Sequence, residues 1–174
     1  MRSVSLIAIL VLVPAASAQQ RTQIYFKEPA GMKVYWFTTA KDGKQSFSAT
    51  PLEAPGRFNF LQGAIYRLKL THLPGHAGLE LFPTLEVPAP TPHAREFLAH
   101  NAVPIVLTEE DVNQVVKGNF LVKVVYLPHA KGDGGGDQIA LASGQDAVRE
   151  AARRGSILMI VRIGNIVEPP GAKK

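Results

Sequence analysis

Residues 64–87, "AIYRLKLTHLPGHAGLELFPTLEV", hold two strand-like runs on either side of a Pro-Gly corner. In the first run, apolar residues from Tyr66 to Leu70 alternate with polar residues that begin at Arg67. An alternation with a period of two predicts a β-strand with one buried and one solvated face. Continued by two residues, this alternation places His72 on the apolar face.

The corner separates His72 from His76 by Pro74 and Gly75. Pro followed by Gly favours a type II turn, which splays hairpin strands, so we expect a wider corner that also uses Gly78. A tight hairpin would put the two histidines on opposite sides, whereas a looser corner lets the rings meet. They are therefore weak candidates for a metal site, with a partly buried His72 and an exposed His76 as the structural alternative. A metal would need further ligands, with the candidates being His93, His100 and His129.

The second run, "LELFPTLEV", places acidic side chains opposite its leucines. Glu80 or Glu86 can therefore pair across strands with Arg67 or Lys69. Pro83 predicts an edge strand or a bulge in this run.

The pattern from Ile24 onwards is β-like, and "MKVYWFT" and "RFNFLQ" add two further strand candidates. Four such runs in a short span predict a sandwich or a small barrel. Helix signals then appear. Thr91 and Pro92 begin a helix that runs to Asn101, where a left-handed C-terminal position is expected.

Two helix-strand units complete the chain. Thr108 and three acidic residues begin a helix that Gly118 ends, and the buried strand "NFLVKVVYLP" follows. The helix "GQDAVREAARRG" ends at Gly155 before the strand "SILMIVRIG". These strands are expected to lie centrally, with helices over one face. The predicted class is α+β and mainly β, with a β-sandwich-like core of immunoglobulin or transthyretin type and two or three short helices in the C-terminal half.

The N-terminus reads as an export signal, because Arg2 precedes a short apolar run and a small-x-small motif that ends at Ala18. We expect a signal peptide over residues 1–18, a single β-rich domain over 19–167 and a flexible tail over 168–174. The apolar run is too short to span a membrane, so no integral membrane segment is expected after cleavage. The chain has no cysteine, which excludes disulfides and favours a bacterial periplasm or cell surface.

Aromatic residues concentrate early in the chain, where Tyr35, Trp36 and Phe37 are consecutive. Because side chains alternate along a strand, these three cannot all enter one core. Either both faces of the strand are covered, or an aromatic side chain binds a glycan or another apolar ligand. Tyr35, Trp36 and Phe37 are thus weak candidates for ligand binding.

No linear motif supports catalysis or a cofactor. The sequence lacks a Gly-x-Ser-x-Gly elbow and a His-Glu-x-x-His pair, and Ser156 has no placed base. The acidic run from Glu109 to Asp111 is explained by a helix start. The stretch "KGDGGGDQ" at 131–138 lacks the pattern of an EF-hand and is expected to be a flexible surface loop. We therefore expect no catalytic residue and no cofactor.

Four blocks stand in order along the chain: "LTHLPGHAGLELFPTLEVPAPTP", "REFLAHNAVPI", "DVNQVVKGNFLVKVVYLP" and "RRGSILMIVRIGN". In these blocks the chain resembles a family of uncharacterised secreted bacterial proteins, over roughly residues 57–165. The resemblance implies no activity and assigns no role to any residue.

A net charge of +5 favours contact with anionic envelope material, while dispersed basic residues and export argue against nucleic-acid binding. The leading hypothesis is a non-enzymatic, envelope-associated module that binds a protein partner or an anionic cell-surface polymer. One alternative is a metal-dependent periplasmic hydrolase that uses His72 and His76. Another is a subunit of an exported assembly.

Overall fold

The computed structural model describes residues 20–39, 43–129, 139–144 and 146–164. The expected signal peptide, the "KGDGGGDQ" loop and the C-terminal tail lie outside these residues. The strands are β1 (Arg21–Glu28), β2 (Lys33–Thr39), β3 (Gln45–Phe47), β4 (Leu52–Glu53), β5 (Gly56–Leu61), β6 (Ala64–Thr71), β7 (Thr84–Val87), β8 (Val103–Val106), β9 (Leu121–Pro128), β10 (Ala140–Ser143) and β11 (Gly155–Ile163). The helices are α1 (Pro92–His100), α2 (Glu109–Val116) and α3 (Ala147–Arg154).

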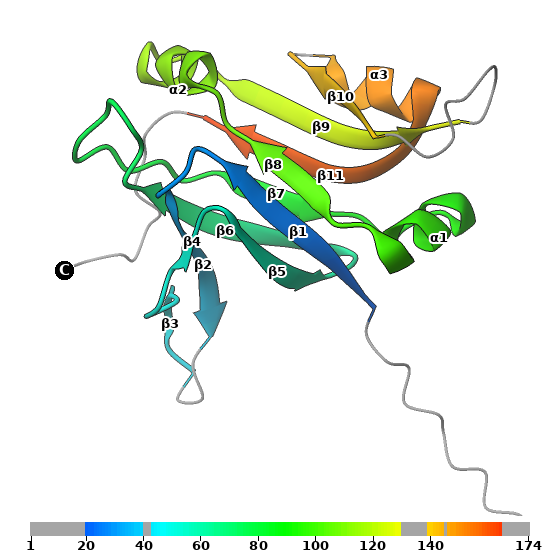
Figure 1. The fold of residues 1–174 in the computed structure, drawn as a ribbon, viewed down its shortest axis with the longest axis horizontal. Coiled ribbons are helices and arrows are strands. Elements are labelled where there is room, and N and C mark those ends of the chain that lie inside the picture. The colour runs from blue at the N-terminus through cyan, green and yellow to red at the C-terminus, as the bar shows by residue number, and fades with distance from the viewer. Residues whose placement is uncertain (1–19, 40–42, 130–138, 145, 165–174) are drawn as a thin grey trace, which may run out of the picture.

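Two sheets form a sandwich-like, mainly β fold, which confirms the predicted class and its three short helices in the C-terminal half. The small sheet has the order β5-β1-β8, with β1 and β8 parallel. The large sheet has the order β10-β9-β11-β7-β6-β2-β3, and β4 pairs with β2. In Figure 1, β1 and β8 cross in front of β6, β7 and β11.

Apolar side chains fill two layers, one on each side of the large sheet. The main core contains Ile24 and Phe26 of the small sheet together with Leu68, Leu85 and other inward-facing residues of the large sheet. The second layer lies between the large sheet and α3. Because β9 and β11 carry apolar residues on both faces, they can be buried centrally, as predicted.

Only part of the prediction for the helices is confirmed. The helix α3 packs on β9, β10 and β11, whereas α1 and α2 lie at opposite ends of the molecule and do not cover the same face (Figure 1). Among the described residues, no helix is long and apolar enough to span a membrane.

The helix starts follow the sequence closely. The hydroxyl of Thr91 accepts from the backbone N–H of Ala94 at 3.2 Å, and Thr108 forms a capping box with Asp111. These contacts satisfy backbone donors that a helix start leaves open. The end of α1 differs from the prediction, because Asn101 is extended (φ −127°) rather than left-handed. Its backbone N–H still donates to the carbonyl of Phe97, so the helix end is satisfied by another route.

The corner between β6 and β7 is the wide one that the sequence predicts. The N–H of His76 donates to Leu73, and the N–H of Leu79 donates to His76, each at 3.1 Å. These two turns have positive φ at Gly75 (76°) and Gly78 (78°), a conformation that glycine adopts without steric cost.

The strand after this corner is shorter than the predicted run. Only Thr84–Val87 forms β7, while Leu81 makes an isolated bridge to Leu70. The strand β7 lies between β6 and β11, so the expectation of an edge strand at Pro83 is wrong. Pro83 precedes β7 and accepts a hydrogen bond from Leu68 through its carbonyl. This arrangement needs no N–H from the proline.

Several strands were not among the predicted runs, namely β1, β3, β4, β8 and β10. The strands β3, β4, β8 and β10 are each two to four residues long, too short to show a clear period. The longer β1 forms the centre of the small sheet, and from Arg21 to Phe26 its buried residues alternate with more exposed ones, although its sequence does not alternate polar and apolar residues.

Candidate functional site

One half of the large sheet is left uncovered on its outer side. The register pairs Tyr35 with Lys69, Arg67 with Thr84, and Thr84 with Arg162, so these side chains share one face. Because α3 covers only the half formed by β9, β10 and β11, the rest of this face meets solvent. We call it the open face; it includes Lys33, Tyr35, Phe37, Phe47, Glu53, Ile65, Arg67, Lys69, Glu80, Phe82, Glu86 and Arg162.

Lys69 is the central polar group of the open face. Its Nζ lies 4.8 Å from the ring centroid of Tyr35 and 5.6 Å from that of Phe47. It also lies 3.8 Å from Oε1 of Glu80, as the predicted cross-strand pairing requires. The Lys69 side chain is 25% exposed, so these contacts hold the ammonium beside the rings while part of the side chain stays accessible to water.

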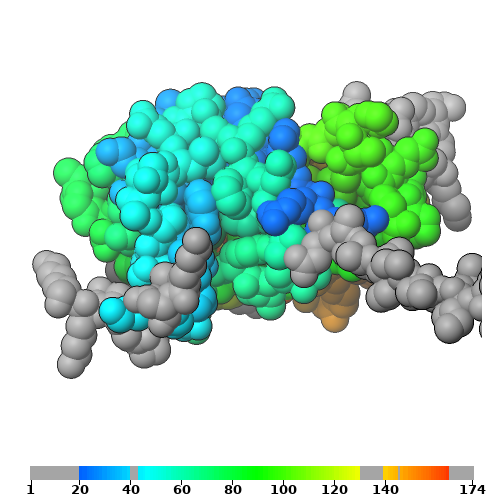
Figure 2. Space-filling view, turned by 90° about the horizontal axis from the view of Figure 1, so that it is seen from below, coloured from blue at the N-terminus to red at the C-terminus, as the bar shows by residue number. Residues whose placement is uncertain are grey.

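Aromatic rings continue the face beyond Lys69. Phe47 packs edge-on against Phe37 at 5.2 Å between centroids and reaches Phe82 at 6.1 Å. All three rings are only partly buried. In Figures 1 and 2, β2 and β3, which are drawn in cyan, lie at the opposite end of the molecule from α1, which is drawn in green.

A shallow hollow of about 420 Å³ lies where the open face meets the β6–β7 corner. We call it the corner hollow. Tyr35, Lys69, His72 and Glu80 are among the residues that line it. Two residues singled out from the sequence for different reasons, Tyr35 and His72, thus line one depression.

The position of His72 differs from the prediction made for it. The alternation of β6 placed it on the apolar face, with a partly buried ring, but it is exposed. The strand ends at Thr71, and His72 adopts a left-handed conformation (φ 57°) that redirects its side chain. The ring Nδ1 lies 2.8 Å from the hydroxyl of Thr71, while Leu73 takes the buried position. His76, expected to be exposed, is instead partly buried in the corner.

The histidines do not assemble a metal centre in the described part of the chain. No group of three or more His, Cys, Asp or Glu side chains with metal-binding geometry occurs among those residues. His93 and His100 lie together on α1, away from the corner, and His129 follows β9. The pair His72 and His76 therefore has no described third ligand from the candidates that the sequence offered.

The three consecutive aromatics divide between the two faces, as strand alternation predicts. Tyr35 and Phe37 belong to the open face. Trp36 points the other way, with its ring 4.1 Å from Phe58 and 6.2 Å from Phe60. It packs against the main core, so its contribution is structural, while Tyr35 and Phe37 remain candidates for ligand binding.

Other sequence candidates have structural roles. Ser156 is buried, and its hydroxyl lies 2.7 Å from that of Thr91, the residue that caps α1. Asp111 completes the cap of α2 and pairs with Lys123. The pKa of Asp111 is lowered: burial raises it, but the hydrogen bonds from Lys123 and Thr108 outweigh that effect.

Sequence reasoning missed Lys69 and Phe47 as members of the site. The alternation of β6 already placed Lys69 on the polar face, but the pairing of β6 with β2, which brings it to Tyr35, is a long-range contact. Phe47 lies on a three-residue strand that gave no signal of its own.

Comparisons with known proteins supply no relative. No protein-family model matches the chain. No curated protein matches it, and no solved structure does. The resemblance to a family of secreted bacterial proteins stays a prediction.

Proposed function

We propose that this protein is an exported, envelope-associated binding protein without enzymatic activity, and that its open face binds an anionic cell-surface polysaccharide. The observation that carries the proposal is the arrangement of Lys69 between the rings of Tyr35 and Phe47 on an uncovered sheet face. Planar aromatic side chains offer apolar surface to a sugar ring, and the ammonium beside them attracts a carboxylate or a sulfate.

The charge of the open face supports an anionic ligand. It carries four basic side chains, Lys33, Arg67, Lys69 and Arg162, against three acidic ones, Glu53, Glu80 and Glu86. Arg162 and Glu86 form an ion pair at 2.7 Å, and Lys69 and Glu80 lie 3.8 Å apart. Lys33 lies opposite Glu53 in the register of β2 and β4, so Arg67, two residues from Lys69 on β6, provides the excess positive charge.

Export and periplasmic or cell-surface location belong to the same proposal. They rest on the signal-like N-terminus and the absence of cysteine from the sequence. Fractionation of the producing cells tests this part: the protein should be found outside the cytoplasm and lack residues 1–18. A full-length protein confined to the cytoplasm would contradict it.

The binding test compares polygalacturonate, an anionic polysaccharide, with neutral dextran by calorimetric titration. We expect saturable binding of polygalacturonate alone, weakening as salt is raised because exposed charges are screened. Lys69→Ala should weaken binding about tenfold, equivalent to about 1.4 kcal/mol. Tyr35→Ala should also weaken it, by removing the ring beside the ammonium.

The matched control is Arg95→Ala, which removes one positive charge from an exposed position on α1. Its affinity should stay within about twofold of the unmodified protein, because only non-specific attraction changes. Equal losses for Lys69→Ala and Arg95→Ala would show that net charge, and not the open face, governs binding. Turnover of a substrate with stoichiometric zinc, lost on His72→Ala, would replace the proposal with the hydrolase alternative.

A further inference from the structure

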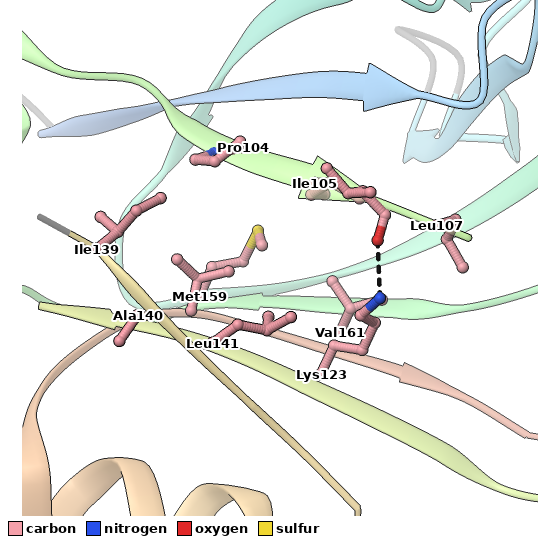
Figure 3. A pocket seen from close by; sticks show the side chains of 11 residues that line it. Pro104, Ile105, Leu107, Lys123, Ile139, Ala140, Leu141, Met159 and Val161 are labelled. Atoms are coloured by element: carbon pink, nitrogen blue, oxygen red, sulfur yellow. Dashed lines mark hydrogen bonds between the residues drawn. The ribbon is translucent and has the colours of Figure 1, made fainter. Parts of the chain in front are cut away.

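A narrow apolar cavity opens between the edges of the two sheets, on the opposite side of the large sheet from α3. We call it the inter-sheet slot. It has a volume of about 170 Å³ and lies between β8 of the small sheet and β9, β10 and β11 of the large sheet. Figure 3 shows its walls, to which Ile105, Val125, Leu141, Met159, Val161 and Lys123 contribute.

The slot arises from the unequal width of the two sheets. The strand β8 is the last strand of the small sheet, and β10 is the last strand of the large one. Val125 and Leu141 are cross-strand partners on β9 and β10, so their side chains share the inner face beyond the cover of β8. Protein interiors leave few voids larger than a water molecule, so an apolar space of this size is unusual for a packed core.

Among the residues that the structure describes, Lys123 is the one charged side chain in the walls of the slot. It is 9% exposed and points between the sheets from β9. Its Nζ donates to the carbonyl of Val106 at 2.9 Å and pairs with Asp111. The N–H of Leu107 donates to Glu28 of β1, so the carbonyl of Val106, on the same peptide unit, points away from β1. Lys123 thus satisfies an edge carbonyl in the wall of the slot.

The electrostatics of this pair restrict the ligand. An ammonium has three N–H donors, and among the described residues Val106 and Asp111 accept two of them. The lowered pKa of Asp111 keeps that carboxylate ionised at neutral pH, so the pair carries no net charge. A ligand carboxylate at Lys123 would face the Asp111 charge, whereas an uncharged oxygen would not.

We propose that the inter-sheet slot binds a short aliphatic molecule with a neutral oxygen acceptor, such as an alcohol or an ester, with the chain along the apolar walls and the oxygen at Lys123. This site is separate from the open face, and the inference does not depend on the proposed polysaccharide. An apolar cavity of about 150 Å³ accommodates a molecule the size of benzene. The slot matches that size and is open at its mouth, so a longer chain can extend past Leu141, which is 57% exposed.

The test follows methyl NMR signals of Val125, Leu141 and Met159 in the full chain during titration with 1-octanol and with octanoate. Both probes have the same chain length and differ in the charge of the head group. We expect saturable shifts with 1-octanol and at least about fivefold weaker binding of octanoate, a difference of about 1 kcal/mol. Octanoate binding as tight as 1-octanol, or no saturable shift with 1-octanol, overturns the proposal.

Two exposed aliphatic residues provide the matched variants. Leu141→Glu places a charge at the mouth of the slot and should weaken 1-octanol binding more than about tenfold, because the chain would have to desolvate it. Ile65→Glu makes the same kind of change at a residue that is 66% exposed on the open face, and should alter binding less than about twofold. Equal effects of the two variants would overturn the assignment of the site.

A third variant tests the head group. Lys123→Met removes the donor and should weaken 1-octanol binding, while octanoate, which would meet the uncompensated charge of Asp111, should bind no better than before. Because Lys123 also pairs with Asp111, circular dichroism first checks that the Lys123→Met variant folds. The location of the site is tested independently by Leu141→Glu. A folded Lys123→Met variant that binds 1-octanol with unchanged affinity would overturn the role of the ammonium.

Discussion

Ile65 and Ile160 lie on either side of Glu86, on the same face of the large sheet. Ile65 is 66% exposed, whereas Ile160 is 4% exposed under α3. The same residue type in equivalent positions of one sheet face therefore has opposite surroundings. The burial of residues on this face therefore depends on which half of the sheet α3 covers, and not on the strand pattern alone.

Small residues of α3 pack against the half of the large sheet that this helix covers, which we call the covered half. Ala147 and Ala151 of α3 are buried against β9 and β11, and their short side chains let the helix approach the sheet closely. The opposite surface of α3 carries arginines paired with Asp146 and Glu150. No helix in the described part of the chain covers the open face, and aromatic rings and lysine side chains form its surface. On the outer side of the large sheet, this open half is consequently the one available to a ligand.

The largest loss of stability in the covered half is expected for Gly155→Ala, at the junction of α3 and β11. A Cβ atom built there would lie 2.1 Å from the backbone carbonyl oxygen of Leu127, which cannot move aside without shifting β9. We expect the free energy of unfolding to fall by about 3 kcal/mol or more, measured by urea denaturation.

Gly78→Ala in the corner of the open half is the control for that change. Its Cβ would have open space, but its φ of 78° disfavours a side chain, so the expected loss is about 1 kcal/mol. Equal losses at the two glycines would contradict the view that the covered half depends on close packing.

The next largest effect is expected at Lys123, on the inner face of the covered half. Lys123→Met leaves the carboxylate of Asp111 without its main partner in a mostly buried position. The free energy of unfolding should fall by about 3 kcal/mol, because an uncompensated buried charge is costly. The double variant with Asp111→Asn should recover part of this loss in a double-mutant cycle. Strictly additive losses would show that the two residues do not interact.

The paired isoleucines test the comparison directly. Ile160→Ala should lower the free energy of unfolding by about 2 kcal/mol, because it leaves a cavity under α3. Ile65→Ala should change it by less than about 0.5 kcal/mol, since an exposed side chain gains little from folding. Thermal unfolding of both variants gives the result. Similar losses would mean that something covers the open face in the isolated protein.

The smallest effect is a dependence on pH. Asp111 has a lowered pKa in the folded state, so its contribution to stability is present above its unfolded pKa, near 3.8, and is lost as the pH falls through the folded value. Asp111→Asn should flatten the fall in stability below about pH 4. Glu150 also has a lowered pKa, caused first by its hydrogen bond from Arg153, but its side chain is more exposed than that of Asp111, so Glu150→Gln should change the slope less. Identical slopes for the two variants would contradict this assignment.

Sequence patterns within a few residues correctly predicted the helix starts, the corner and the two long apolar strands. Thr91 and Thr108 cap helices, Gly75 and Gly78 turn the corner, and the long apolar runs form β9 and β11. Each of these features depends on residues within a few positions of one another. The short strands β8 and β10 escaped prediction because their pairing partners are distant and their own patterns are brief.

The candidate site was predicted only in part. Strand alternation predicted that Tyr35 and Trp36 face opposite ways, and that Lys69 can pair with Glu80. It was wrong about His72, because a single left-handed residue after Thr71 ends the alternation. No sequence pattern predicted the left-handed conformation of His72, since a non-glycine residue seldom adopts positive φ.

The sequence by itself determined the export-like N-terminus, the class of the fold, the helix caps and the wide corner, because these depend on composition and on local chemistry. Only the tertiary structure decided that Lys69 lies between Tyr35 and Phe47, that α3 covers one half of the large sheet, and that a slot remains between β8 and β10. Those arrangements depend on pairings between distant strands, whose register no local pattern specifies.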